Sequence, residues 1–190
     1  MQQKSVSTKK IVLTALLAAL TVAGSALRIK VPLDITGFSA FHLGNILCAL
    51  SGILLGPWIG GLAAGLGSAI YDMMDPVYIS ECWITFIMKG VYAVVVGLIT
   101  HRGNKHWNGG YLSALIGTFA GAISYAVLYL AKGYFYSGRL ISGLTHEAAL
   151  LNIVGKLPAT FFNAVIAIVC APLLAIAISK ALKKSRLSLE

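Results

Sequence analysis

Two lysines stand inside strongly apolar stretches of the sequence and are the side chains there best able to bind or react. Lys89 follows CWITFIM, and Lys156 lies within ALLNIVGKLPATFF. If these stretches cross a bilayer, insertion scales put the cost of a central lysine at about 2.5–3.5 kcal/mol, so such a lysine usually faces a cavity or a partner. We therefore predict that both lysines bind a ligand. The alternative, which the sequence leaves open, is pairing with Glu81 or Glu147 or extension of the ammonium to the membrane surface.

Aromatic and amide side chains accompany the two lysines in the same half of the predicted helices. Small-molecule sites combine apolar walls with a few placed polar groups. Trp83, Tyr125 and Tyr129 suit stacking on a planar ring. Asn163 follows Pro158 and is expected to bond the carbonyl that the proline leaves free. The predicted binding residues are Lys89, Lys156, Trp83, Tyr125, Tyr129, Asn152, His42 and Asn45.

Motifs for catalysis, nucleotide binding or metal binding do not occur in the sequence. A Walker loop, HExxH, GxSxG and paired carboxylates within the apolar segments are all missing. The three cysteines, Cys48, Cys82 and Cys170, show no CxxC or His/Cys spacing. We therefore predict no catalytic residue, no metal site and no cofactor. If the chain takes part in transport, the lack of a nucleotide site means that the energy must come from another component.

The composition indicates an integral membrane protein. Of 190 residues, 58% are hydrophobic and 11% are charged, and the mean hydropathy is +0.84. A water-soluble domain of this size would not tolerate that balance on its surface. The net charge of +9 lies mainly at the chain ends and in one loop, which favours membrane topology over a nucleic-acid partner. We expect residues 1–190 to form one membrane domain in contact with the lipid bilayer.

Apolar segments predict an all-α fold, a compact bundle of six transmembrane helices. The stretch 41–75 reads as a helical hairpin around Gly56-Pro57, and residues 28–40 are expected to form a loop. Pro158 predicts a short first segment and then a kinked helix in the last apolar region. The expected helices cover roughly residues 11–27, 41–55, 58–74, 82–100, 111–136 and 148–182.

The distribution of lysine and arginine predicts the orientation of the bundle. An even number of helices places both termini on one side, together with the loop at 101–110. That side carries Lys4, Lys9, Lys10, Arg102, Lys105, Lys180, Lys183, Lys184 and Arg186, whereas the opposite loops carry Arg28, Lys30, Lys132 and Arg139. By the positive-inside rule both termini are cytoplasmic. We expect a multi-pass protein of the bacterial plasma membrane.

Three alanines recur at four-residue spacing in the first predicted helix. Ala15, Ala19 and Ala23 form one stripe of small side chains, along which another helix can approach closely. The stripe predicts either packing within the bundle or a docking face for a second membrane protein.

The block FHLGNILCALSGILLGPWIGGLAAGLGSAIYDMMDP, followed by ECWITFIMKG, carries a family resemblance. With the alanine stripe and the six-helix plan, it resembles the S component, the substrate-binding membrane subunit, of energy-coupling factor (ECF) vitamin transporters. The resemblance implies a water-soluble vitamin as substrate. It also implies that Ala15, Ala19 and Ala23 contact a transmembrane coupling protein that carries two ATPase subunits. The implied pocket lies near the outer face, under the first, third and fifth loops, between helices four to six.

The side chains leave the substrate open. The aromatic residues suit a planar ring such as hydroxymethylpyrimidine, a pyridoxine-type vitamin or riboflavin, whereas the two lysines suit an acid such as pantothenate or folate. We favour a small ring compound and no enzymatic activity. The alternatives of another class are a stand-alone secondary carrier or channel, which would move solute without partners, and a membrane enzyme.

Overall fold

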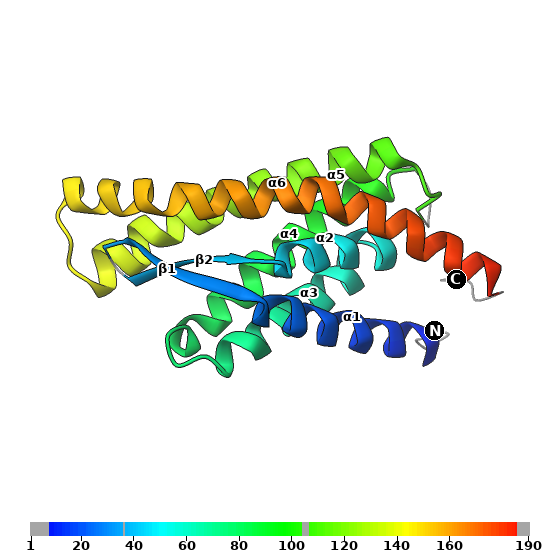
Figure 1. Cartoon of the computed structure of the whole chain (residues 1–190), viewed down its shortest axis with the longest axis horizontal. Helices are drawn as coiled ribbons and strands as arrows, with labels where there is room; N and C mark the ends of the chain where they lie inside the picture. Colours follow the sequence, from blue (N-terminus) through cyan, green and yellow to red (C-terminus); the bar gives the residue numbers. More distant parts are fainter. Residues whose placement is uncertain (1–7, 36, 104–106, 186–190) are drawn as a thin grey trace, which may run out of the picture.

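A computed structural model describes residues 8–35, 37–103 and 107–185 (Figure 1). Most of these residues are helical, and one β-hairpin follows the first helix. The elements are α1 (Thr8–Ala26), β1 (Arg28–Asp34), β2 (Gly37–His42), α2 (Gly44–Leu55), α3 (Pro57–Met73), the 3₁₀ helix η1 (Ile79–Glu81), α4 (Cys82–Thr100), α5 (Tyr111–Ala131), the π-helix η2 (Lys132–Ile141) and α6 (His146–Lys184).

Helix α2 lies at the centre of the bundle. It contacts α1, α3, α4, α5 and α6, and ten of its twelve residues are buried. A helix that is apolar all round is stable when other helices surround it, and the sequence GNILCALSGILL meets that condition. The remaining helices therefore pack around α2.

Small residues allow the helices to approach closely at the corner between α2 and α3. Gly56 has a φ of 79°, a conformation that favours glycine, and Pro57 starts α3. A Cβ atom on Gly97 would lie 2.4 Å from the backbone nitrogen of Pro57, so glycine is required for α4 to contact this corner.

Helix α1 begins and α6 ends at the same end of the molecule, and the α5–α6 connection lies at the opposite end (Figure 1). Among the described residues, three helical segments are long and apolar enough to cross a membrane: Ile79–Thr100, Tyr111–Ile141 and His146–Lys184. Lys10–Ala26 and Gly44–Leu55 are shorter apolar helices. The fold is therefore that of a mostly helical membrane protein.

The structure differs from the sequence-based expectation in three segments. Residues 28–34 and 37–42 form the two strands of an antiparallel hairpin, where a loop was expected at 28–40, with Lys30 opposite Ala40 and Val31 opposite Ser39. The fifth helix changes from α to π geometry after Ala131. The last helix is continuous from His146 to Lys184 through two prolines, without a separate first segment.

Candidate functional site

A cavity of about 170 Å³ lies beneath the hairpin. Its walls come from the end of α1, both hairpin strands, α3, η1, α4, α5, η2 and α6, so it brings together parts of the chain that are distant in the sequence. Hydroxyl, amide and charged groups line it alongside tyrosine rings and a few apolar side chains. The described residues contain no group of three His, Cys, Asp or Glu side chains placed to hold a metal ion. The chemistry of the cavity is that of binding a polar small molecule.

Five of the eight predicted binding residues line this cavity. They come from four elements: β2, α4, α5 and α6. The five are His42, Lys89, Tyr125, Tyr129 and Lys156.

The other three predicted residues lie outside the cavity wall. Asn45 is buried and accepts a hydrogen bond from the Lys89 ammonium, so it positions that lysine. Asn152 is fully buried, and its Nδ2 donates to the Gly133 carbonyl at 3.2 Å. Trp83 is 56% exposed and packs edge-on against Tyr136, with ring centroids 6.1 Å apart.

Lys89 is almost fully buried, with 4% of its surface exposed. Its Nζ lies 4.0 Å from the centroid of the Tyr125 ring, and it donates to Asn45 Oδ1. The tyrosine face and the amide oxygen together stabilise an ammonium that apolar surroundings alone would disfavour. Of the two alternatives for this lysine, pairing with Glu81 is wrong, because Glu81 bonds elsewhere.

Lys156 lies on the other side of a tyrosine pair. The Tyr125 and Tyr129 rings are stacked with centroids 5.9 Å apart, and Lys156 Nζ is 5.6 Å from the Tyr129 centroid. The Lys156 alkyl chain passes close to η2, since a Cβ atom on Gly133 would lie 2.9 Å from Lys156 Cε. Glycine at position 133 therefore makes room for this lysine.

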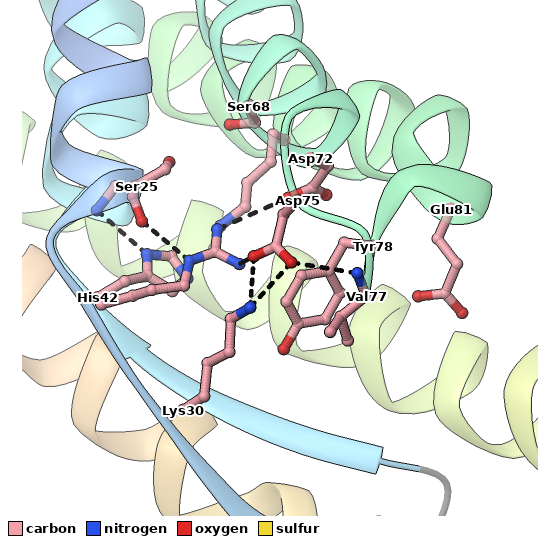
Figure 2. Close-up of polar contacts among 12 residues, drawn as sticks. Ser25, Lys30, His42, Ser68, Asp72, Asp75, Val77, Tyr78 and Glu81 are labelled. Carbon is pink, nitrogen blue, oxygen red and sulfur yellow. Dashed lines mark hydrogen bonds and ion pairs between the residues drawn. The ribbon is translucent and has the colours of Figure 1, made fainter.

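A second group of charged residues, which the sequence analysis did not predict as site residues, fixes the hairpin to the end of α3. Arg28 is 3.6 Å from Asp72 and 3.9 Å from Asp75, and Lys30 is 2.6 Å from Asp75. Figure 2 shows Lys30, Asp72 and Asp75 beside Tyr78. The Arg28 guanidinium also lies over the Tyr78 ring, 5.0 Å from its centroid. The nearest signal in the sequence was the presence of two short charged segments, the basic RIK after the first helix and the acidic DMMD at the end of the third.

Two groups of the hairpin region have shifted pKa values. Burial lowers the pKa of His42 well below 6.5, and the positive charges of Lys89 and Arg28 lower it further. Burial alone would raise the pKa of Asp75, but hydrogen bonds from Lys30 and the Val77 amide, with the nearby cations, bring it below its ordinary value. His42 is therefore neutral and Asp75 ionised at neutral pH.

Glu81 links the other side of the cavity. Its carboxylate accepts from the Lys132 ammonium and, at 3.0 Å, from the Ser137 hydroxyl. In Figure 2, Glu81 lies apart from Asp75, on the neighbouring segment. The hairpin and the π-helix η2 together form the roof of the cavity. Asp72 and Asp75 bind the hairpin, and Glu81 binds η2.

Asn163 has a role that the sequence analysis assigned differently. Its Nδ2 donates to the Ala40 carbonyl at 2.8 Å, and its Oδ1 accepts from the His42 amide at 2.9 Å. The expected bond to a carbonyl freed by Pro158 is therefore wrong. Asn163 instead joins α6 to β2 and also lines the cavity.

The alanine stripe faces outward. Ala15, Ala19 and Ala23 are exposed, whereas Leu17 and Thr21 on the same helix are buried. Of the two alternatives left by the sequence, packing of these alanines within the bundle is therefore wrong.

Helices of membrane-spanning composition surround a cavity lined by polar groups. These features define the class, a membrane protein that binds small molecules. Residues 5–182 match the family described as ECF-type riboflavin transporter, S component. The chain belongs to this family, which confirms the resemblance seen in the sequence. It is thus a substrate-binding subunit for vitamin transport, in a family whose members act with transmembrane and ATPase components. An "uncharacterized protein in gap 3′region" from Pyrococcus woesei is 33% identical over 120 residues, 63% of this chain and 74% of that protein.

Proposed function

We propose that this chain captures a single-ring vitamin or vitamin precursor in the cavity beneath the hairpin, with hydroxymethylpyrimidine or a pyridoxine-type compound as the first candidates. The observation that carries the proposal is the size and lining of the cavity. A volume of about 170 Å³ is below the roughly 300–1,000 Å³ of sites for drug-sized ligands. The wall offers the ring of such a ligand two cations, two aromatic rings and one neutral hydrogen-bonding group. These are Lys89 and Lys156, Tyr125 and Tyr129, and His42.

Riboflavin is the second candidate, because the matched family is described by that substrate. Six serine and threonine side chains in the wall suit a hydroxylated ligand of this type: Ser25, Ser68, Ser80, Thr85, Ser137 and Thr160. The larger ring system requires the cavity to expand.

Identification of a retained molecule separates the two candidates. Purified protein is analysed by native mass spectrometry, and the bound compound is then released by denaturation and identified. We expect a single-ring compound. A released flavin would replace the first candidate by the second. If neither single-ring vitamins nor riboflavin bind tightly in a titration, the proposed function is contradicted.

We also propose how the subunit is energised. The exposed alanine stripe of α1 docks a transmembrane coupling protein that carries two ATPase subunits, and the basic chain ends are cytoplasmic. As a result, uptake requires partners and ATP. In proteoliposomes that contain this chain alone, no accumulation is expected. Uphill uptake driven by an ion gradient there would instead establish a stand-alone secondary carrier.

A further inference from the structure

The Lys89 ammonium is only partly satisfied by the protein. It donates to Asn45 Oδ1, and no Asp or Glu of the described residues forms an ion pair with it. An ammonium has three N–H donors, and a neutral amide takes one of them. The side chain is buried and lines the cavity. A ligand in the cavity can therefore accept hydrogen bonds from Lys89.

The carboxylates of the cavity wall are engaged with other cations. Asp72 lies 3.6 Å from Arg28, and Glu81 is paired with Lys132. Cations in the wall outnumber these two carboxylates by two to one; they are Arg28, Lys89, Lys132 and Lys156. Because charge interactions are stronger in a poorly hydrated interior than in water, this excess favours an anion in the cavity.

The positions of the ammonium groups also bear on how a ring would bind. Lys89 covers one face of Tyr125, 4.0 Å from the centroid, and Lys156 lies 5.6 Å from the centroid of Tyr129. A neutral ring would have to displace Lys89 before stacking on that face. An anionic group gains charge-assisted hydrogen bonds without such a displacement.

We propose that the substrate carries a carboxylate or a phosphate group, and that Lys89 binds this group with Lys156 as a second cation nearby. The inference rests on the proposed function of the cavity and narrows it, from single-ring vitamins in general to their acidic members. Asn45 is the positioning residue, because it directs the Lys89 ammonium.

Matched pairs of ligands test the charge directly. The carboxylate pair is nicotinate and nicotinamide, and the phosphate pairs are pyridoxine 5′-phosphate with pyridoxine and hydroxymethylpyrimidine phosphate with the free pyrimidine. Isothermal titration at pH 7.5 is expected to show at least about tenfold tighter binding for the acid in one pair, since a charged hydrogen bond contributes roughly 1.5–3 kcal/mol. The pair that shows the preference identifies the type of anion.

Variants of Lys89 assign the effect to this residue. Lys89→Met is expected to bring the ratio of the affinities for the acid and the neutral compound close to one, and Lys89→Arg is expected to retain the preference for the acid. Lys180→Met is the matched control, because Lys180 is exposed on α6 and lies outside the cavity wall. The paired titrations of the unaltered protein decide the question even if a variant does not fold.

Two results would overturn the inference and leave the proposed function intact. One is equal or tighter binding of the neutral member in every pair. The other is a preference for the acid that Lys89→Met leaves unchanged in folded protein. If none of these compounds binds, the proposed single-ring function fails together with the inference.

Discussion

At the scale of single residues, His42 couples the stability of the hairpin to pH. Its Nδ1 accepts a hydrogen bond from the Gly44 amide at 3.1 Å, which requires a free lone pair on that nitrogen. Burial, Lys89 and Arg28 lower the pKa of this imidazole well below 6.5. A folded-state pKa below the unfolded value stabilises the protein above pH 6.5, and this stabilisation is lost as the pH falls from 6.5 toward the folded pKa.

We therefore expect the thermal midpoint to fall between pH 7.5 and pH 5.0, and the fall to be smaller in His42→Gln. Differential scanning fluorimetry in detergent at the two pH values measures it. His146→Gln is the control, because His146 is exposed. An equal fall in the original protein and in His42→Gln would show that His42 does not carry the pH dependence.

Asp75 is the second residue whose role can be isolated. It joins the hairpin to α3 through Lys30 at 2.6 Å, and 8% of its side chain is exposed. We expect Asp75→Asn to reduce the free energy of unfolding by about 1–3 kcal/mol, because Lys30 and the largely buried Arg28 then lose a charged partner. A cycle with Lys30→Met, measured by unfolding in mixed micelles, should be non-additive. Additive effects would mean that the two side chains do not stabilise each other in solution.

At the scale of elements, two buried asparagines on α6 hold different parts of the roof. Asn163 bonds both Ala40 and His42 in β2, whereas Asn152 bonds Gly133 in η2. Asn163→Leu is expected to increase amide hydrogen exchange of residues 37–42 and leave residues 132–141 unchanged, and Asn152→Leu should do the reverse. Each substitution leaves buried backbone groups without a partner, at a cost of roughly 1–3 kcal/mol per group. Equal exchange across both elements in either variant would contradict separate anchoring.

The same elements show what the sequence could and could not predict. Helical segments and the lysines within them were recognisable, since apolar runs and isolated charges are local patterns. The hairpin was not, because a two-stranded ribbon is marginal by itself and this one depends on Asn163 and Asp75, far along the chain. Arg28 and Asp72 were missed as site residues because charges near helix ends are ordinary in membrane proteins, and only their contacts set them apart.

At the scale of the whole molecule, the proposed binding cavity and the proposed docking surface are formed by different side chains. The cavity lies under the hairpin and is lined by α3 to α6, the η segments, both strands and, from α1, Ser25 near its end. Ala15, Ala19 and Ala23 are exposed on the outer face of α1. α1 meets the bundle through its opposite face, where Thr21 packs near Gly67 of α3. A change on the exposed stripe should therefore alter association without altering the cavity.

Ala19→Leu tests this separation. The larger side chain prevents close helix approach along the stripe, so we expect loss of copurification with the coupling protein and ligand affinity within about twofold of the original. Ala181→Leu, at an exposed alanine near the end of α6, is the matched control and should leave complex formation unchanged. Pull-down from cells that express all subunits measures association, and titration of the isolated chain measures binding. Normal assembly of Ala19→Leu would show that the coupling protein docks elsewhere. If Ala19→Leu loses both association and ligand affinity, the stripe and the cavity are structurally coupled and not separate.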